Sequence, residues 1–393
     1  MNRLLEFAVD KTLWQANQIE LADTIRLMLY QHHPAWFERL DYDDDRIFLE
    51  PAFFYFFSEK SFLPLPLEQL IYGYLPEADR PKRISCLTDP FGFTYLPNVG
   101  VLKTGVSAKR IDLELKGRHA ICHAASDRVL DIMPIDYLKG SALALCDHLP
   151  FILYTENGKP QDFAESASST KVSQRLSLER AATLLQNHAP FFWHLVEQST
   201  RELAVFNSPM LRSMGAVSYL GTAFINTEGQ PHDEVFFIDD LAHQIGHILF
   251  YSLTLKVDDY LTVPKTILLA ELTGVSYDKR EVYSAFHGLF TYTTILHCLQ
   301  ACLAAQVWSE RHQLEAVARM GFYMAKFALD LSYMDDPRIF TPVGRRWYEA
   351  FREGFNHIDR FWKSAYQSFD YSSQPYIFNF QAFLKTNFQG AFV

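Results

Sequence analysis

The stretch from Val282 to Ser309 contains no charged side chain, and this feature constrains the fold more than any other. An uncharged segment of this length either spans a membrane or forms a helix buried at the centre of a domain. It also contains His287, His297, two glutamines and several threonines. Such polar groups need hydrogen-bond partners inside a protein. We therefore predict a buried central helix and no membrane interaction.

The remaining sequence favours a mainly α fold with an α+β N-terminal portion. Residues 1–75 show aromatic-rich helical patterns. Residues 82–123 consist of short alternating runs broken by Gly, Pro, Asn and Asp, which are typical of strands joined by turns. From Val235 to Trp362 the pattern is mostly helical. The segment MLRSMGAVSYLGTAFIN, from Met210, is expected to form a short hairpin.

A polar segment separates the α+β pattern of the N-terminal portion from the helical pattern that follows, and it suggests a domain boundary. Residues from Thr155 to Gln174 are poor in large apolar side chains, so we predict a flexible connection there. Ser177 is a good N-cap and is expected to begin the next helix. The chain then divides into residues 1–160, an α+β portion suited to recognising a substrate, and residues 175–393, a helical catalytic domain.

Charge and cysteine content exclude several classes of protein. The formal net charge is −10 and the pI is about 5.8, with no cluster of Lys and Arg, so nucleic acids and anionic membranes are not expected partners. The five cysteines are scattered and form no CxxC pair, which argues against a disulfide framework. The first residues, MNRLLEFAVDKTLW, have no apolar core or cleavage site of a signal peptide. These features favour a cytoplasmic protein.

The sequence DDLAHQIGH places His243 and His247 four residues apart. On a helix both imidazoles lie on one face, one turn apart, and can bind one metal ion. The surrounding helix is apolar, so two polar rings on it require partners. Gly246 is expected to leave open space beside the pair.

A third ligand has to come from elsewhere in the chain, and two residues compete for this role. His287 lies in SAFHGLF on the next strongly apolar helix. Glu271, in LLAELTG, is the type of ligand that a gluzincin-type zinc hydrolase would use. Tyr283 precedes His287 by one helical turn and is placed to reach the same pocket.

Four blocks in order carry a resemblance to a known family. They are MLRSMGAVSYL, LAHQIGH, DKREVYSAFHGLFTY and FTPVGRRWYEAF. Over roughly residues 178–357 the chain resembles the HExxH-type peptide-modification family, which comprises iron- and 2-oxoglutarate-dependent β-hydroxylases. The resemblance implies Fe(II) bound by His243, His247 and His287, with 2-oxoglutarate and molecular oxygen as co-substrates. It also implies a peptide or carrier-bound amino-acid substrate.

The same resemblance assigns a cofactor-binding role to Arg345 or Arg346. These arginines match the pair that ends the family's conserved stretch, and an arginine fork suits the distal carboxylate of 2-oxoglutarate. Thr341 and Pro342 have the character of an N-cap and a first helical residue. Arg345 and Arg346 are therefore expected in the first turn of a helix.

Gln244 departs from the family's HExxH pattern. In a zinc hydrolase the glutamate at this position accepts a proton from metal-bound water, and glutamine cannot do so. An oxygenase does not need that base, and Gln244 could instead orient a ligand or contact the substrate. The sequence therefore favours a hydroxylase acting on a side-chain carbon. A gluzincin-like hydrolase using Glu271 and a non-catalytic binding protein with a relic metal site are the alternatives.

Overall fold

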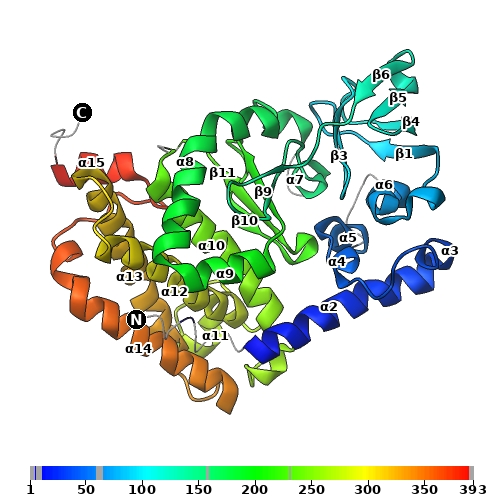
Figure 1. Cartoon of the computed structure of the whole chain (residues 1–393). Coiled ribbons are helices and arrows are strands. Elements are labelled where there is room, and N and C mark those ends of the chain that lie inside the picture. Colours follow the sequence, from blue (N-terminus) through cyan, green and yellow to red (C-terminus); the bar gives the residue numbers. More distant parts are fainter. Residues whose placement is uncertain (1–4, 6–10, 59–64, 156–158, 230–231, 389–393) are drawn as a thin grey trace. The chain divides into compact units, whose positions relative to one another are not determined.

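The computed structural model describes residues 5, 11–58, 65–155, 159–229 and 232–388 (Figure 1). Most of residues 1–14, in which the sequence indicates no signal peptide, lie outside these described ranges. The chain forms two compact units, and neither is a single stretch of sequence. The helical unit comprises Met1–Trp14, Arg180–Val196 and Gln230–Val393, and the mixed unit comprises Gln15–Glu179 and Glu197–Gly229.

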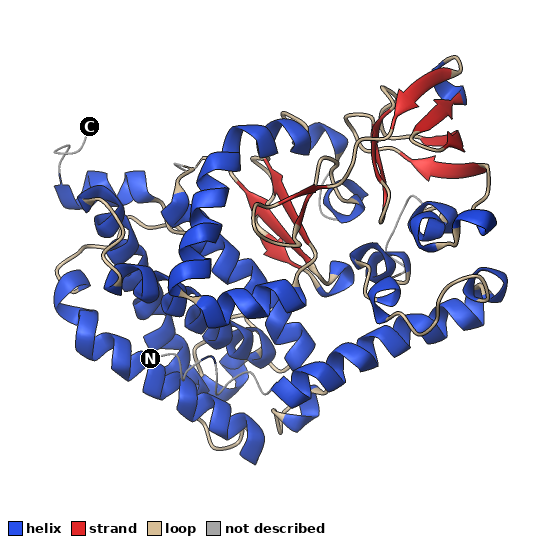
Figure 2. Cartoon of the chain, in the orientation of Figure 1, coloured by secondary structure: helices blue, strands red, loops and turns tan. Residues whose placement is uncertain are grey.

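The first part of the mixed unit consists of one long helix, α2 (Lys11–His32), and several short ones (Figure 2). Pro34 and Pro51 occupy first-turn positions of two of them, where a helix needs no backbone N–H donor. The helices are α2 (Lys11–His32), α3 (Pro34–Phe37), α4 (Asp45–Phe48), α5 (Pro51–Phe56), α6 (Leu67–Ile71) and α7 (Phe151–Thr155). The 3₁₀ turns are η1 (Tyr72–Tyr74), η2 (Glu77–Asp79), η3 (His123–Ala125), η4 (Pro160–Asp162) and η5 (Val217–Tyr219).

Strands follow in the region where the alternating runs predict them. A four-stranded antiparallel sheet has the order β1-β4-β5-β6, and β2 pairs with β3. In RIDLELK, Ile111, Leu113 and Leu115 alternate with more exposed residues, as expected for a sheet with one buried face. These strands are β1 (Arg83–Leu87), β2 (Phe93–Leu96), β3 (Gly100–Lys103), β4 (Arg110–Lys116), β5 (His119–Cys122) and β6 (Arg128–Asp131).

A second, five-stranded sheet combines distant parts of the sequence. Its order is β10-β11-β9-β8-β7, and β9 runs parallel to both β8 and β11. The hairpin predicted after Met210 is confirmed, because β10 and β11 are antiparallel with Met214 opposite Phe224. These strands are β7 (Asp136–Tyr137), β8 (Ala144–Leu145), β9 (Glu202–Phe206), β10 (Met214–Gly215) and β11 (Thr222–Asn226).

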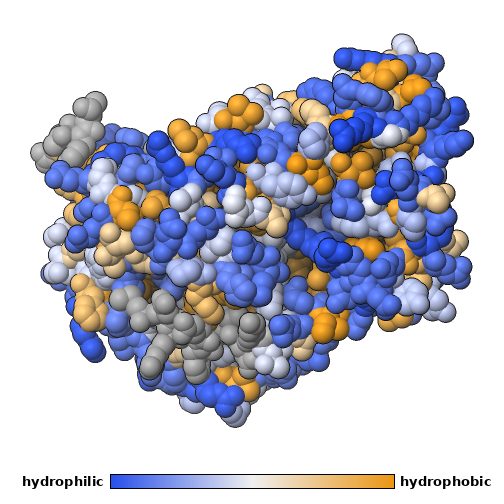
Figure 3. Space-filling view, viewed as in Figure 1, coloured by the Kyte–Doolittle hydropathy of each residue, from blue (hydrophilic) through white to orange (hydrophobic). Residues whose placement is uncertain are grey.

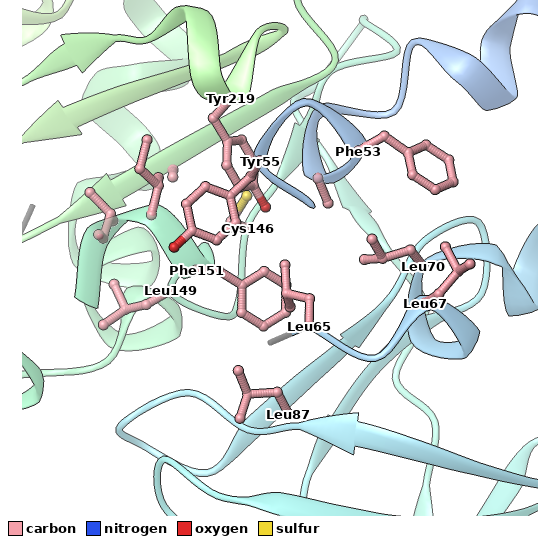
Figure 4. Close-up of a cluster of buried hydrophobic side chains, with 14 of the residues drawn as sticks. Phe53, Tyr55, Leu65, Leu67, Leu70, Leu87, Cys146, Leu149, Phe151 and Tyr219 are labelled. Atoms are coloured by element: carbon pink, nitrogen blue, oxygen red, sulfur yellow. The ribbon is translucent and has the colours of Figure 1, made fainter. Parts of the chain in front are cut away.

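A buried hydrophobic cluster joins the helices and sheets of the mixed unit (Figure 4). Phe53, Leu70 and Phe151 come from α5, α6 and α7, and each buried side chain of this size contributes roughly 1.5–3 kcal/mol. Gln69 is also fully buried: its Nε2 donates to the Tyr95 carbonyl at 2.9 Å and its Oε1 accepts from the Leu87 N–H at 2.7 Å. The α6 helix is thereby fixed to β1 and β2.

The predicted flexible connection is wrong over its second half. The helix α8 (Ala167–His188) begins at Ala167, ten residues before Ser177, and α9 (Pro190–Ser199) follows it. The polar side chains of this segment are held by ion pairs within the mixed unit. The Lys171 ammonium lies 2.9 Å from Asp136 Oδ2 and 2.7 Å from Asp147 Oδ1, and Lys171 is buried. Polar composition therefore reflects buried ion pairs here rather than mobility.

The helical unit contains the long helices predicted after Val235. The interruptions fall where the proline-containing segments PKT and DDPRIFTP predict them. The elements are α10 (Glu234–Leu253), η6 (Val257–Asp259), α11 (Leu269–Thr273), α12 (Val282–Ala304), α13 (Glu310–Met334), α14 (Pro342–Tyr366) and α15 (Phe380–Phe388).

The uncharged stretch forms α12, and most of its side chains are buried in the helical unit. None of the helices within the described ranges combines the length and apolarity required for a membrane span. All five cysteines are free and buried, so Cys298 and Cys302 are core thiols, as their spacing suggests. On the face drawn in Figure 3, hydrophobic residues lie scattered among hydrophilic ones, which is ordinary for a protein surface.

Candidate metal-binding site in the helical unit

The helix α10 carries His243 and His247, and its start is fixed by its N-cap. Asp233 has an extended backbone, and its Oδ1 accepts from the N–H groups of Val235 and Phe236 at 3.1 and 3.2 Å. Glu234 adds a negative charge in the first turn, where the helix dipole favours it. The helix then continues for five turns through a largely buried, apolar sequence.

The helices α10 and α12 pack side by side, and this packing brings the histidines together (Figure 1). The Thr294 hydroxyl of α12 donates to the Ala242 carbonyl of α10 at 2.8 Å. A Cβ atom added to Gly246 would lie 2.6 Å from Thr294 Oγ1. The expectation that Gly246 leaves open space for a ligand is therefore wrong: its small size permits close contact with α12.

Three imidazole rings meet where these helices touch. His243 and His247 stack with ring centroids 4.9 Å apart, and the His247 and His287 rings lie edge to face at 4.2 Å. His247 Nδ1 and His287 Nε2 are 2.5 Å apart. Phe250 stacks on the other side of His287 at 4.5 Å, and Tyr251 contacts the same ring at 4.7 Å. The structure thus brings together the three histidines that the sequence singles out.

All three rings are uncharged at neutral pH. Burial lowers the pKa of His243 to about 4; Asp239 opposes this shift and Lys326 adds to it. Burial, with a smaller effect from His243, lowers the pKa of His287 to about 3. Burial and the two neighbouring histidines also hold the pKa of His247 well below its ordinary value. A neutral imidazole keeps the nitrogen lone pair that binds a metal ion.

A buried ion-pair network lies one turn before His243. Asp239 Oδ2 accepts from Arg319 Nη1 at 2.6 Å and from the Tyr323 hydroxyl at 3.2 Å. Arg319 also donates to Glu315 Oε1 at 2.7 and 3.0 Å. Asp239 Oδ1 is buried and accepts no hydrogen bond within the described part of the chain. This network joins α13 to α10 and leaves one carboxylate oxygen for a further donor.

Gln244 is buried on α10, and its side chain bonds within its own helix. Its Nε2 donates to Asp240 Oδ1 at 2.7 Å. Its Oε1 is buried and accepts no hydrogen bond from the residues described here. The amide oxygen is therefore the part of Gln244 that remains for a ligand or substrate, and the predicted role in orienting one stays a prediction.

Tyr283 and Glu271 occupy different surroundings. The Tyr283 hydroxyl shares a hydrogen bond with Thr254 Oγ1 at 2.9 Å, and its ring centroid lies 6.5 Å from that of His287. Glu271 is exposed in the first turn of α11, where its Oε1 accepts from the Leu268 N–H at 3.2 Å. Tyr283 is thus a neighbour of the histidine cluster, whereas Glu271 caps a short helix.

The predicted arginines stand near the start of α14: Arg345 ends the first turn, as expected, and Arg346 begins the second. Thr341 is the N-cap, its hydroxyl accepts from the Gly344 N–H at 3.1 Å, and Pro342 begins the helix. Arg345 donates from Nε to Glu349 at 2.8 Å and from Nη2 to Asp335 at 3.0 Å. Arg346 is exposed. Arg345 would have to exchange a carboxylate partner to bind a dicarboxylate ligand.

Two cations near the histidines were not singled out from the sequence. Lys326 of α13 lowers the pKa of His243 by its charge, and burial lowers its own pKa to about 8. Arg280 forms a bidentate pair with Asp330, at 2.6 and 2.9 Å. Asp330 Oδ2 would lie 3.2 Å from a Cβ on Gly288, next to His287. In the sequence, the four-residue spacing of Lys326 and Asp330 places both on one face of α13, and this signal could have indicated the polar group.

The three imidazoles are chemically suitable ligands for a metal ion, but two of their nitrogens lie too close together in this structure to share one. Three neutral imidazoles are suitable ligands for Fe(II) or Zn(II). Two nitrogens bound to one metal at about 2.1 Å lie about 3.0–3.4 Å apart, whereas His247 Nδ1 and His287 Nε2 are 2.5 Å apart. No set of three or more His, Cys, Asp and Glu side chains in the described ranges has the geometry of a metal site. These two nitrogens must separate by about 0.5–0.9 Å to share a metal.

Comparisons of this chain with models of known protein families and with curated proteins give no match.

Proposed function

We propose that this chain is an Fe(II)- and 2-oxoglutarate-dependent oxygenase whose metal ligands are His243, His247 and His287. The observation that supports it best is the meeting of these three neutral rings between α10 and α12. Ferrous iron with 2-oxoglutarate and oxygen supplies an oxidant that can replace a C–H hydrogen with hydroxyl. Three protein ligands leave room for both co-substrates.

The residues around the histidines hold and shield them. Asp239 lies one turn before His243, and its unpartnered Oδ1 is available to accept from a ligand imidazole N–H. Arg319 and Tyr323 fix the other oxygen of the same carboxylate. Phe250 and Tyr251 pack on His287 and restrict the access of water to it.

Gln244 favours this chemistry over hydrolysis. A zinc hydrolase would need a general base at this position, and the Gln244 amide is bonded to Asp240 instead. Glu271, the third ligand of a gluzincin-type site, caps α11 at the surface. An oxygenase requires neither group.

The order of the four sequence blocks extends the proposal to the substrate class. The resemblance they carry suggests hydroxylation of a side-chain carbon, at the β position, in a peptide or amino-acid-derived natural-product intermediate. The carrier or peptide that presents this group would be the main partner of the protein.

The proposal can be tested by following both co-substrates. Protein purified without oxygen should bind Fe(II) at one per chain and, with 2-oxoglutarate, develop the weak visible charge-transfer absorption of a chelate. Admission of oxygen should then convert 2-oxoglutarate to succinate. Zinc held at one per chain, with neither absorption nor succinate formed, would rule the proposal out.

The carboxylate partner of 2-oxoglutarate can be identified in the same assay. Arg345→Gln or Arg346→Gln is expected to raise the Kd for 2-oxoglutarate by roughly 10- to 100-fold, because one charge-assisted hydrogen bond is lost. Lys326→Gln is the comparison variant, since its charge already acts on His243. If only Lys326→Gln raises the Kd, the role belongs to Lys326 and the assignment to the arginines is wrong.

A further inference from the structure

A large cleft in the mixed unit has two buried carboxylates in its wall. The cleft has a volume of about 740 Å³ and is lined by residues of α4, η1, β2, the β7–β8 region and the start of β9. This volume lies within the usual range of small-molecule sites, about 300–1,000 Å³. Glu50 and Glu202 are 4% and 3% exposed, although both line an open cleft.

Each carboxylate is held by two neighbouring groups: Tyr74 and the Ala52 backbone bond to Glu50, and Thr222 and Tyr95 bond to Glu202. Glu50, immediately before α5, accepts at Oε2 from the Tyr74 hydroxyl at 2.6 Å. Glu202, the first residue of the central strand β9, accepts at Oε2 from the Thr222 hydroxyl at 2.9 Å. Glu50 Oε1 is buried and accepts no hydrogen bond from the residues that the structure describes. Glu50 Oε1 is therefore a buried carboxylate oxygen in the wall of the cleft, and it lacks a donor among the described residues.

Negative charge exceeds positive charge around this oxygen. Arg201 is the cation that acts on both carboxylates, and its guanidinium is also bonded to the Arg46 carbonyl. The Arg46 guanidinium itself is paired with Asp44, at 2.7 and 2.8 Å. The other charged or titratable groups that line the cleft are Tyr74, Tyr95, Tyr137 and Glu197. Among the described residues that line the cleft, Arg201 is the cation that acts on both buried acids, so the pair favours either a retained proton or a further positive group.

We propose that this cleft binds an organic cation, a primary ammonium or guanidinium group whose N–H donors reach Glu50 Oε1 and the Glu202 carboxylate. Such a group supplies a donor for the unpaired Glu50 oxygen and a positive charge beside both carboxyl groups, and it can also lie against the rings of Tyr74 and Tyr95. The cleft is far larger than a metal ion requires, so an elongated amine fits it better. This site is independent of the histidine cluster and of the oxygenase proposal.

Binding of a cation should displace a proton. Burial raises the pKa of Glu202 to about 8, and the nearby Glu50 carboxylate adds to this shift. Burial raises the pKa of Glu50 too, whereas Arg201 lowers it. The pair therefore retains a proton near neutral pH, and a bound cation would release it to solvent. Affinity should rise with pH up to about 8, by up to about tenfold per pH unit, and then level off.

Agmatine, which carries both an ammonium and a guanidinium group, is a suitable probe for calorimetry on the full chain. We expect saturable binding at one site, inhibited by low pH, with proton release seen as different heats in phosphate and HEPES buffers, neither of which contains a primary ammonium. Butane-1,4-diol, a neutral molecule of similar length, should not bind. Absence of agmatine binding up to about 10 mM at pH 8 would overturn the proposal, as would binding of Ca²⁺ without binding of agmatine.

Three variants locate the binding site. Glu50→Gln and Glu202→Gln should each weaken agmatine binding at least tenfold and abolish most of the proton release. Their Tm should stay unchanged or rise, because each removes a buried charge from a repelling pair. Glu228→Gln, which removes an exposed carboxylate outside the cleft, should bind like the wild type. Agmatine binding that survives in both cleft variants would contradict the assignment.

Discussion

Replacing His287 with asparagine is expected to weaken Fe(II) binding more than about 100-fold, because even groups that only support metal ligands contribute about 10- to 100-fold. Formation of succinate should be lost with the metal. The change keeps a polar group of similar size beside Phe250, so the fold should survive. Metal affinity is best measured by competition with a chelator of known Fe(II) affinity, and folding by circular dichroism.

Two matched variants separate the role of His287 from general effects of substitution. His297→Asn removes another buried histidine of α12 and should leave Fe(II) affinity unchanged. Glu271→Gln should also bind iron normally, because Glu271 lies exposed at the start of α11. Loss of metal in Glu271→Gln with retention in His287→Asn would transfer the third ligand to Glu271 and reopen the hydrolase alternative.

Replacing Arg319 with methionine is expected to lower the free energy of unfolding by roughly 3–5 kcal/mol at pH 7. Arg319 is 3% exposed and lies between Asp239 and Glu315, so its removal takes the ion-pair partner from Asp239 and leaves Glu315 with only the partly exposed Arg311. Burial raises the pKa of Glu315 even with Arg319 present to oppose the shift. A raised pKa in the folded state gives stability that is lost as pH rises, so the variant should be closest to the wild type in acid.

Urea unfolding at about pH 5 and pH 8 tests both parts of this expectation. Arg311→Met is the control. Arg311 pairs with Glu315 on its own helix, α13, and with Asp233, the N-cap of α10, but its side chain is 40% exposed. Exposed ion pairs of this kind contribute at most about 1 kcal/mol. Equal stability of Arg319→Met and the wild type at pH 7 would show that the network contributes little.

The parts of the fold that follow local patterns could be predicted from sequence. Apolar residues at helical spacing, interrupted by proline-containing segments, indicate the order of α10, α12, α13 and α14. The four-residue spacing of His243 and His247 places them on one face of a helix in any fold. Two long apolar helices are expected to pack against each other. This expectation made His287 of the second helix a candidate neighbour of His243 and His247.

Features that depend on distant contacts could not be predicted in this way. The polar residues before Ser177 form a helix in which Lys171 makes ion pairs with Asp136 and Asp147, two residues outside that helix. The sequence suggests open space beside Gly246, but in the fold α12 packs closely against this glycine. The sequence of α10 alone does not show which helix will pack there. Glu50 and Glu202 are far apart in the sequence, and only the fold brings both into the wall of one cleft.

The division of the chain into interleaved pieces has a consequence for biosynthesis. Every residue of the mixed unit lies between Gln15 and Gly229, including both sides of the parallel β8–β9 pair. On a translating ribosome this unit can be complete while residues 230–393 still need on the order of ten seconds to emerge. The segments Met1–Trp14 and Arg180–Val196 of the helical unit are made before this point, but Gln230–Val393, the rest of that unit, is not. The nascent chain must therefore carry Arg180–Val196 before most of the unit to which this segment belongs has been synthesised.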